Sequence, residues 1–285
     1  MARRRLNGLR ILLTGASSGI GFAMASQLVQ AGADVLVTAR RRERLELLAQ
    51  QTQSAPGKLH LIDGDLTLAT HRAELIRWCN EHWHGLDVLI NNAGAGAIGP
   101  FALANVERLR RVMEVDFFAP VELTRLSIPL LQRGKRPAIL NIGSVLAHRA
   151  VPNKSEYCAA KFALRGWAEA LRVELASLHI EVLMVSPSTT RSEFFDSLVD
   201  TDPNTPSKSV GSMSPEQVAA KAISALVRSK REMILSLGGK ALVAMGRWLP
   251  SLTDRVLLKT IPAPAPAAVN PVAVNPASSK PTSPE

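Results

Sequence analysis

The chain has 285 residues, of which 46% are hydrophobic and 20% are charged, and its formal net charge is +10 at pH 7. It is too long and too apolar for a disordered chain, and its 18 Gly and 18 Pro are too few for a collagen. Its two cysteines, Cys79 and Cys158, supply neither a disulfide framework nor a metal-ligand cluster. We therefore expect a globular protein of a reducing, cytoplasmic compartment, without a metal site.

The positive charge is concentrated in two parts of the chain. Eight arginines fall within residues 1–44 and seven basic groups within residues 228–259, each against two acids. No helix-turn-helix, zinc or aromatic-platform motif accompanies this charge, so no nucleic acid is expected as a partner. A phosphorylated cofactor or an anionic lipid suits the two clusters better. No stretch approaches the roughly 20 apolar residues that a membrane-spanning helix needs.

Short apolar runs alternate with longer stretches of helical pattern along most of the chain. The strand-like runs are Arg10–Thr14, Asp34–Ala39, Lys58–Asp63, Asp87–Asn91, Ala138–Ile142, Glu181–Val185 and Glu232–Leu237. The helical stretches lie near residues 20–31, 42–53, 68–83, 104–132, 155–178 and 214–229. Near-continuous apolar strands that alternate with helices are typical of a parallel sheet covered on both faces. We therefore predict an α/β, Rossmann-type doubly wound parallel sheet of about seven strands in three layers, with ligands at the carboxyl ends of the strands.

The pattern changes in kind toward the end of the chain. We expect a Rossmann domain over residues 1–239, an amphipathic helical extension over 240–260 and a disordered Pro/Ala-rich tail over 261–285. The extension mixes large apolar side chains with basic ones, which leaves two interpretations open. It is either a helix packed on its own domain or at an oligomer interface, or a segment, residues 240–259, that touches an anionic membrane peripherally.

A glycine-rich turn follows the first predicted strand and opens the first predicted helix. In this turn, Gly15 permits a tight bend, Gly19 lets the backbone approach a pyrophosphate, and Gly21 allows close packing of helix on strand. The free N–H groups and the positive end of the helix dipole then face the phosphates. The turn predicts a dinucleotide site with contacts from Gly15, Ser17, Ser18, Gly19, Ile20 and Gly21.

The end of the second predicted strand indicates which dinucleotide binds. An NAD site places an acid there for the ribose hydroxyls, whereas this chain has a run of arginines and no acid until Glu43. Because a guanidinium binds a 2′-phosphate bidentately, we expect NADP(H) over NAD(H), with Arg40 and Arg41 as its readers. The alternative is a merely solvated arginine cluster, which would cover Arg42 and Arg44 more readily than Arg40.

Two further strand ends carry small or polar residues at the same edge. Asp65 and Leu66 follow the third strand, where Asp65 would accept a hydrogen bond from the adenine amino group. Asn92, Ala93 and Gly94 follow the fourth strand, where small residues let the ribose lie against backbone and the Asn amide can tie neighbouring strands. An ordinary strand-end turn is the alternative for the second group.

One serine, one tyrosine and one lysine have the spacing of a proton-transfer site. Tyr157 and Lys161 are four residues apart on a predicted helix, so they share a face, while Ser144 ends the fifth strand. The Lys161 ammonium, together with the positive nicotinamide of the oxidised complex, is expected to lower the pKa of Tyr157. Tyr157 would then exchange a proton with a carbonyl or alcohol as hydride moves to or from the nicotinamide. Ser144 would hold the carbonyl oxygen, and Lys161 would also bind the ribose hydroxyls. A Tyr-x-x-x-Lys pair alone is usually a surface pair, but the sequence has one Tyr.

Three motifs follow one another along the chain: Thr-Gly-x-x-x-Gly-Ile-Gly, Asn-Asn-Ala-Gly, and a Ser followed thirteen residues later by Tyr-x-x-x-Lys. Together they resemble the short-chain dehydrogenase/reductase family, over about residues 7–237. The resemblance implies a single-domain Rossmann fold, NAD(P)-dependent oxidoreduction of an alcohol or carbonyl, and a homodimer or homotetramer. It places the glycine motif on Gly15, Gly19 and Gly21. It places the catalytic groups on Ser144, Tyr157 and Lys161.

The chain departs from the family pattern at two positions. Asp116 stands where the family usually has an Asn that holds a proton-relay water, and an ionised Asp accepts hydrogen bonds but cannot donate one. We count Asp116 among the catalytic candidates, since its charge can pair with Lys161. After the sixth strand, Pro187 is followed by Ser188 in place of a glycine, which puts the geometry of that loop in question. In the same loop, Thr190 and Ser192 are expected to contact the nicotinamide.

The substrate side of the site is expected in the loop over residues 188–213 and around Leu146 and His148. Phe194, Phe195 and Leu198 predict an apolar underside to this loop, which favours an apolar carbonyl or alcohol over a charged sugar. We expect His148 on the rim rather than in catalysis. The functional hypothesis is an NADP(H)-dependent oxidoreductase; the alternative is a cofactor-binding sensor or scaffold of the same fold without turnover.

Overall fold

The structure, a computed structural model, describes residues 3–188, 190, 199 and 213–259. Ser192, the apolar residues Phe194, Phe195 and Leu198, and the tail 261–285 all carry predictions that lie outside the described residues.

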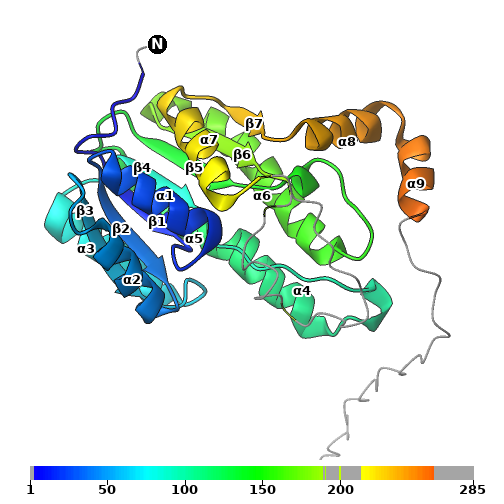
Figure 1. Cartoon of the computed structure of the whole chain (residues 1–285), viewed down its shortest axis with the longest axis horizontal. Helices are drawn as coiled ribbons and strands as arrows, with labels where there is room; N and C mark the ends of the chain where they lie inside the picture. Colours follow the sequence, from blue (N-terminus) through cyan, green and yellow to red (C-terminus); the bar gives the residue numbers. More distant parts are fainter. Residues whose placement is uncertain (1–2, 189, 191–198, 200–212, 260–285) are drawn as a thin grey trace, which may run out of the picture.

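Seven parallel strands form one sheet in the order β3-β2-β1-β4-β5-β6-β7 (Figure 1). They are β1 Arg10–Thr14, β2 Asp34–Ala39, β3 Lys58–Asp63, β4 Val88–Asn91, β5 Ala138–Ile142, β6 Glu181–Ser186 and β7 Glu232–Ile234. β1 pairs in parallel with β2 on one side and β4 on the other, so the strand order reverses at β1. The predicted Rossmann fold is confirmed, and its ligand crevice belongs at this reversal.

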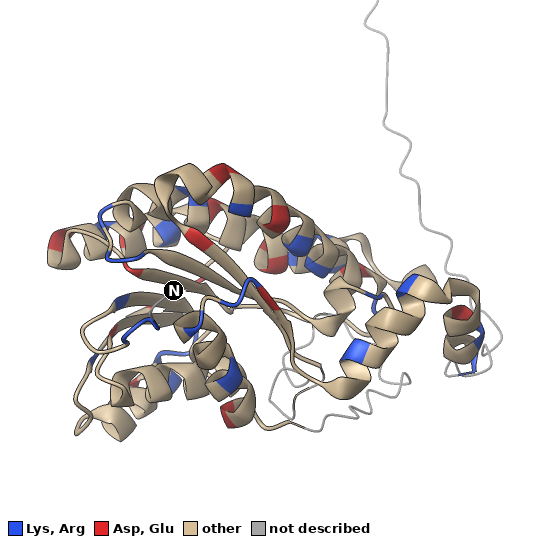
Figure 2. Ribbon diagram, turned by 90° about the horizontal axis from the view of Figure 1, so that it is seen from above, with Lys and Arg blue, Asp and Glu red and all other residues tan. Residues whose placement is uncertain are grey.

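Helices cover both faces of the sheet, which lies between them as a middle layer in Figure 2. The helices are α1 Gly19–Gln30, α2 Arg42–Thr52, α3 Ala69–Trp83, α4 Val106–Met113, α5 Ala119–Leu131, α6 Ser155–Glu174, α7 Pro215–Val227, α8 Leu237–Trp248 and α9 Pro250–Leu258. α1, α2 and α7 share one apolar cluster with the strands, and α3, α5 and α6 share the other. Successive residues of β1 serve opposite faces, since Ile11 and Leu13 belong to the first cluster and Leu12 to the second.

The helix expected over residues 104–132 is broken. α4 ends at Met113, a π-helical turn spans Glu114–Phe118, and α5 starts at Ala119. A π-helical turn adds a residue to the helical repeat, so the side chains that follow it face a different direction. The expectation of one continuous helix is therefore wrong, and the turn carries Asp116, one of the candidate site residues.

The C-terminal extension also differs from its prediction. β7 ends at Ile234 rather than Leu237, and α8 begins at Leu237, so the expected boundary after residue 239 falls inside a helix. The extension consists of two helices that meet at Leu249, whose φ of −133° and ψ of 59° are not helical. Pro250 explains this break, because proline disfavours the helical conformation in the residue before it.

Part of the N-terminal positive charge serves the fold itself. Arg4 is buried, and its guanidinium donates to the Leu226 carbonyl at 2.6 Å and to Glu181 at 3.0 Å. Arg10 forms an ion pair with Asp87 at 2.8 Å. These two arginines are therefore not available to an anionic ligand. None of the described helices is both long and apolar enough to cross a membrane.

Candidate active site

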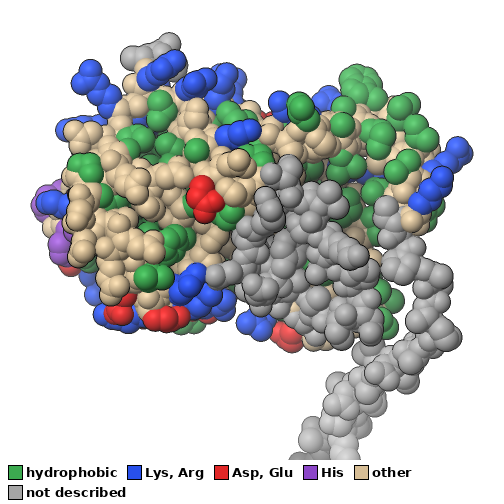
Figure 3. All heavy atoms as spheres, viewed as in Figure 1, with side chains coloured by type: hydrophobic (Ala, Val, Ile, Leu, Met, Phe, Trp, Pro, Cys, Tyr) green, Lys and Arg blue, Asp and Glu red, His purple; other side chains and the backbone are tan. Residues whose placement is uncertain are grey.

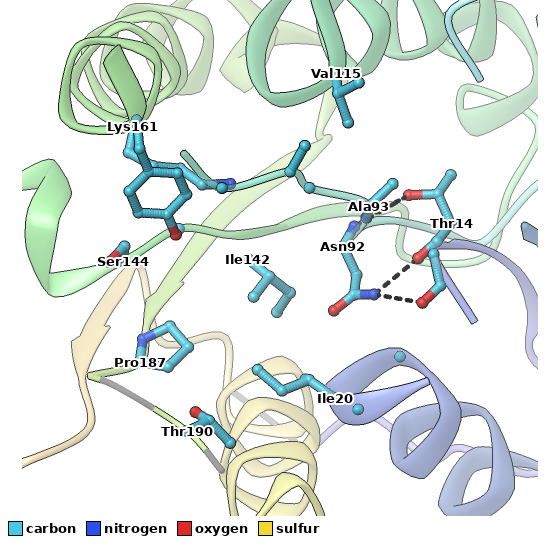
Figure 4. A pocket seen from close by; sticks show the side chains of 18 of the residues that line it. Thr14, Ile20, Asn92, Ala93, Val115, Ile142, Ser144, Lys161, Pro187 and Thr190 are labelled. Carbon is cyan, nitrogen blue, oxygen red and sulfur yellow. Dashed lines mark hydrogen bonds between the residues drawn. The ribbon is translucent and has the colours of Figure 1, made fainter. Parts of the chain in front are cut away.

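A cleft of about 930 Å³ opens at the carboxyl edge of the sheet and is lined by the ends of the central strands. Figure 4 shows Ser144 and Lys161 on the left of it, Asn92 and Ala93 on the right, and Ile20 below. The predicted residues that line the cleft are Gly15, Ser17, Ser18, Gly19, Ile20, Gly21, Arg40, Arg41, Asp65, Leu66, Asn92, Ala93, Gly94, Ser144, Tyr157, Lys161, Pro187 and Thr190. The carboxyl edge of the sheet thus brings together segments that are far apart in the sequence.

The glycine turn has the conformation that the sequence predicts. Gly15 and Gly19 adopt φ values of 72° and 55°, in the left-handed region that favours glycine. Gly21 is needed for a different reason, because a Cβ there would lie 2.2 Å from the Gly15 carbonyl oxygen and 2.4 Å from Asn92 Nδ2. The start of α1 is therefore packed directly on the turn, with its first backbone N–H groups toward the cleft.

Asn92 holds this turn in place. Its side-chain Nδ2 donates to the Thr14 carbonyl at 2.9 Å and to the Gly15 carbonyl at 3.1 Å (Figure 4). In return, the Thr14 hydroxyl accepts from the backbone N–H groups of Asn92 and Ala93, both at 3.1 Å. The amide ties the ends of β1 and β4 together, as predicted. We call these four hydrogen bonds between Asn92, Ala93, Thr14 and Gly15 the clamp. Thr14 belongs to it, although Thr14 is not among the predicted site residues.

The four arginines after β2 divide into two pairs. Arg40 and Arg41 line the cleft, and Arg41 donates to the Ser17 hydroxyl at 3.2 Å. Arg42 points away from it into ion pairs with Glu46 at 2.8 Å and Asp63 at 3.1 Å. Arg44 donates to the Ser17 carbonyl at 3.2 Å and so supports the glycine turn from behind. Two guanidinium groups therefore remain at the cleft wall.

Asp65 stands on the same wall as an ionised acceptor. Its Oδ1 accepts from the Thr67 backbone N–H at 2.9 Å and from the Thr67 hydroxyl at 2.8 Å. Burial acts to raise the pKa of Asp65, but these hydrogen bonds and the charge of Arg40 outweigh it and hold the pKa below its usual value.

Ser144, Tyr157 and Lys161 meet at the other end of the cleft. Ser144 follows β5, caps the short 3₁₀ turn Val145–Ala147 by accepting from the Leu146 N–H at 3.0 Å, and hydrogen-bonds Tyr157. Lys161 Nζ lies 5.6 Å from the centre of the Tyr157 ring, one helical turn along α6. The predicted trio is thus brought together by one strand end and one helix face.

The surroundings of Tyr157 raise its pKa in the chain by itself. Burial of the phenol raises this pKa first, the negative charge of Asp116 raises it further, and the hydrogen bond from Ser144 lowers it only in part. The net pKa therefore lies above its usual value in the chain without a nicotinamide, and burial is the main cause. The Lys161 charge faces the Asp116 carboxylate. That Lys161 and a bound, positively charged nicotinamide lower this pKa stays a prediction.

Asp116 is that carboxylate, and the π-helical turn directs it beneath the cleft rather than into it. Its Oδ1 accepts from the Ala95 N–H at 2.7 Å, and its Oδ2 lies 3.7 Å from Lys161 Nζ. Burial raises the pKa of Asp116 to about 6, although Lys161 and the Ala95 hydrogen bond lower it. Gly94 leaves room for this pair, because a Cβ there would lie 3.0 Å from Asp116 Oδ1 and 3.5 Å from Lys161 Nζ.

The loop after β6 is compatible with the serine that replaces glycine. Ser188 is not among the residues with positive φ, so the chain does not demand there the conformation that serine resists. Pro187, Ser188 and Thr190 all line the cleft, and the Thr190 hydroxyl donates to the Ser188 carbonyl at 3.2 Å.

Beyond Ser144 the cleft continues into what we call the substrate end, lined by Val145, Leu146, Val151, Lys154 and Leu242. Leu146 was predicted there. Val151 and Lys154 were not, although they precede Tyr157 by six and three residues and lie in the loop that leads into α6.

His148 does not lie on the rim, contrary to the prediction. Its side chain is buried and its Nε2 is 3.0 Å from the Ser186 hydroxyl. Burial lowers the pKa of His148, which keeps the ring neutral at pH 7. Within the part of the chain that the structure describes, no group of three or more His, Cys, Asp or Glu side chains is placed to hold a metal ion.

Comparison with known protein families bears directly on this site. The family model described as short chain dehydrogenase matches residues 10–203. The chain belongs to the short-chain dehydrogenase family. Members of this family are NAD(P)-dependent oxidoreductases, and that coarse activity follows for this chain.

Individual members of the short-chain dehydrogenase family show how far the likeness extends. The chain is 29% identical over 257 residues to the ketoacyl reductase HetN of a Nostoc strain, covering 88% of each chain. Its fold matches a family member from Burkholderia phymatum in complex with NAD, with a TM-score of 0.79, 18% identity and coverage of 93% and 99%. It equally matches one from Burkholderia cenocepacia in complex with NADP, with a TM-score of 0.74, 24% identity and coverage of 90% and 99%. At these identities the two structures establish the fold alone.

Proposed function

We propose that the protein is an NADP(H)-dependent oxidoreductase that transfers a hydride between nicotinamide and an apolar carbonyl or alcohol. The observation that carries this proposal is the convergence of Ser144, Tyr157 and Lys161 at one end of a cleft whose other end holds the glycine turn and two arginines. One cleft of about 930 Å³ therefore joins a phosphate-binding turn to a proton donor, which is the arrangement that a dinucleotide-dependent oxidoreductase requires.

Tyr157 acts as the proton donor to the carbonyl oxygen. Because burial and Asp116 keep its pKa above the usual value, the phenol carries its proton at neutral pH, which suits reduction of a carbonyl. A reduced nicotinamide, when bound, would supply a hydride for the carbonyl carbon. The proton that Tyr157 donates to the carbonyl oxygen then completes the alcohol. Ser144 donates a hydrogen bond to the oxygen on which negative charge develops. Lys161 binds the ribose hydroxyls beneath Tyr157.

The preference for NADP(H) rests on Arg40 and Arg41. Both line the cleft, and the chain offers no acid at the end of β2 to accept from ribose hydroxyls. Two guanidinium groups at this point suit the extra phosphate of NADP(H). The proposed cofactor contacts are those predicted residues that line the cleft, with Asp65 as the acceptor for the adenine amino group; Ser192 stays a prediction.

An apolar substrate is supported by the substrate end of the cleft. Val145, Leu146, Val151 and Leu242 supply its walls, and Val199 also faces the cleft. The resemblance to a ketoacyl reductase is consistent with a carbonyl on an acyl-type substrate. Lys154 is a basic residue at this end, and burial lowers its pKa.

We also propose that the protein forms a homodimer through α6. An exposed row of residues at helical spacing runs along this helix: Ala159, Phe162, Gly166, Ala170 and Val173. Phe162 is 42% and Val173 is 77% exposed, and Phe118 lies exposed on the adjoining π-helical turn. Small and apolar side chains in one row allow two helices to approach closely. Two free, buried cysteines suit a reducing compartment such as the cytoplasm.

A titration of purified protein with NADPH and NADH, followed by nicotinamide fluorescence, tests the cofactor part. Binding of NADPH about tenfold or more tighter than NADH is expected; equal binding contradicts the role of Arg40 and Arg41. A carbonyl-reduction screen with the Tyr157→Phe variant tests the chemistry. An enzyme loses about 10²–10⁴-fold in turnover while NADPH binding persists. If no carbonyl is reduced by the wild type and NADPH still binds, the chain is a sensor rather than an enzyme.

A further inference from the structure

The two C-terminal helices carry an exposed apolar surface that the site does not use. Large apolar side chains on α8, α9 and the break between them stand open to solvent, with Leu237 83% and Trp248 75% exposed. We call this set the α8–α9 surface: Leu237, Trp248, Leu249, Leu252 and Val256. Figure 3 shows hydrophobic side chains gathered over these helices at the upper right, apart from the body of the molecule.

The inner face of the same helices explains why the outer face is unpartnered. Gly239 packs so closely that a Cβ would lie 2.6 Å from Val145 Cγ2, and Leu242 lines the cleft. Asp254 pairs with Arg149 and so anchors α9. The residues on the inner side of α8 and α9 therefore make the contacts with the domain. The α8–α9 surface lies on the opposite side and makes none of these contacts.

The positive charge around the α8–α9 surface favours an anionic partner. Residues 237–259 hold four basic side chains, Lys240, Arg247, Arg255 and Lys259, against one acid, Asp254, which is already paired. All four basic residues are exposed, and Arg247 lies over the ring of Trp248 at 5.8 Å from its centre. Apolar side chains including a tryptophan, bordered by cations, match the apolar and anionic layers of a membrane surface.

A second copy of the chain fits this surface less well. A two-fold contact would place the same patch on both partners, so eight basic groups would be brought together with only the two paired acids between them. The neutral row on α6 carries no such penalty. Charge complementarity therefore favours an anionic bilayer for the α8–α9 surface.

We propose that the α8–α9 surface docks the protein peripherally on an anionic lipid bilayer. The helix that carries part of this surface also lines the cleft with its inner side, through Ser236, Gly238 and Leu242 near its start. Docking would hold the substrate end within about one helix diameter of the lipid, with α8 between them, so that an apolar substrate released from the bilayer has a short path to the cleft. This delivery step rests on the proposed function, whereas the docking itself does not.

Vesicle sedimentation of the full chain tests the docking. Wild-type protein should sediment with vesicles of phosphatidylcholine containing about one-third phosphatidylglycerol and remain in solution with phosphatidylcholine alone. The triple variant Trp248→Ser, Leu252→Ser, Val256→Ser should bind about tenfold or more weakly. These positions are exposed, so the variant should fold, which circular dichroism and an unchanged Tm verify. Leu68→Ser, an exposed leucine at the start of α3, is the matched control and should bind as wild type.

Fluorescence gives an independent readout. Trp248 is exposed while Trp78, Trp83 and Trp167 are partly or wholly buried, so anionic vesicles should shift the emission to shorter wavelength, and Trp248→Phe should abolish the shift. The Arg247→Gln, Arg255→Gln double variant should weaken binding by about fivefold per charge.

Three results would overturn the proposal. The first is no sedimentation of the wild type with anionic vesicles. The second is a triple variant that still binds as the wild type does. The third is a fall in oligomer mass of the triple variant in solution without any lipid binding, which would assign the surface to a second copy. Because Tyr157→Phe should bind vesicles normally, failure of the enzymatic proposal and failure of the docking are distinguishable.

Discussion

Lys161 Nζ lies 3.7 Å from Asp116 Oδ2 beneath the cleft, and both side chains are almost fully buried. A buried carboxylate beside a buried ammonium links the charge on α6 to the charge on the π-helical turn. Removing either partner leaves the other without compensation, so this pair governs both the stability of the site and the proton affinity of Tyr157.

Asp116→Asn should alter the pH dependence of stability. The pKa of Asp116 is about 6 in the folded chain, above its usual value near 3.8, so the folded state binds this proton more tightly than the unfolded state. Stability therefore falls as pH rises from about 4 to about 6, by about 3 kcal/mol for a pKa difference of about two, and is constant above. The difference in unfolding free energy between wild type and variant, from denaturant melts at several pH values, should show this slope. A pH-independent difference would contradict it.

The same variant should shift the pH profile of catalysis. The negative charge of Asp116 raises the pKa of Tyr157, so its loss lowers that pKa. Alcohol oxidation needs the phenolate, and its rising limb should move to lower pH by about one unit. Initial rates of oxidation against pH measure this directly. A profile that stays in place would show that Asp116 does not act on Tyr157.

Arg40→Ala and Arg41→Ala should each weaken NADPH binding by about tenfold and leave NADH binding within a factor of about two, because only NADPH carries the extra phosphate. Arg42→Ala is the matched control, since Arg42 is engaged by Glu46 and Asp63 outside the cleft. Fluorescence titrations of all three variants with both nucleotides give the comparison. Equal losses for NADPH and NADH would point to a structural role instead.

Gly21→Ala should destabilise the chain by about 1–3 kcal/mol and weaken cofactor binding, because the new Cβ would collide with the Gly15 carbonyl and the Asn92 amide. Gly166→Ala is its counterpart within α6, where a Cβ meets no atom of the described chain within 4 Å. In a monomer it should stabilise by about 0.5–1 kcal/mol through helix propensity. Thermal melts and mass measurements on both variants test the prediction, and a loss of dimer in Gly166→Ala would support the α6 interface.

Arg108→Met should lower the free energy of unfolding by about 3–5 kcal/mol, because it removes the cation that pairs with the buried Glu156 carboxylate. Glu156 directly precedes Tyr157. Arg108 reaches Glu156 at 2.6 Å, and both side chains are nearly inaccessible. Burial acts to raise the pKa of Glu156, but the Arg108 hydrogen bond and others lower it, so the wild type loses this stabilisation as pH falls below about 4.5. Arg42→Met, in an exposed pair, should change stability by less than about 1 kcal/mol. Urea melts of both variants measure the two losses in unfolding free energy. Equal losses for Arg108→Met and Arg42→Met would contradict the prediction.

Much of the fold and most of the cleft could be predicted because the responsible signals are local. Apolar runs define the strands, Gly15 and Gly19 are required by their backbone conformation, and Tyr157 and Lys161 share a helix face by spacing alone. Sheet order then brings these strand ends to one edge.

The features that could not be predicted depend on contacts between distant segments. The π-helical turn at Glu114–Phe118 keeps the polarity pattern of a helix, so the sequence gives no warning of it. The raised pKa of Tyr157 follows from burial of the phenol and from the charge of Asp116, both of which depend on tertiary packing. His148 reads as a surface residue in a loop, and its burial against Ser186 is a property of the assembled sheet. Pro250, by contrast, was a local signal for the break between α8 and α9.

The clamp between Asn92 and Thr14 affects how much the chain must rearrange when the coenzyme binds. Four hydrogen bonds hold the glycine turn to the neighbouring strand end in the chain by itself. Little conformational entropy then remains to be lost when the pyrophosphate arrives, and no hinge between the two halves of the sheet has to close around it. Association should resemble docking onto a rigid surface, with the backbone amide protons of Asn92 and Ala93 already slow to exchange before any nucleotide is added.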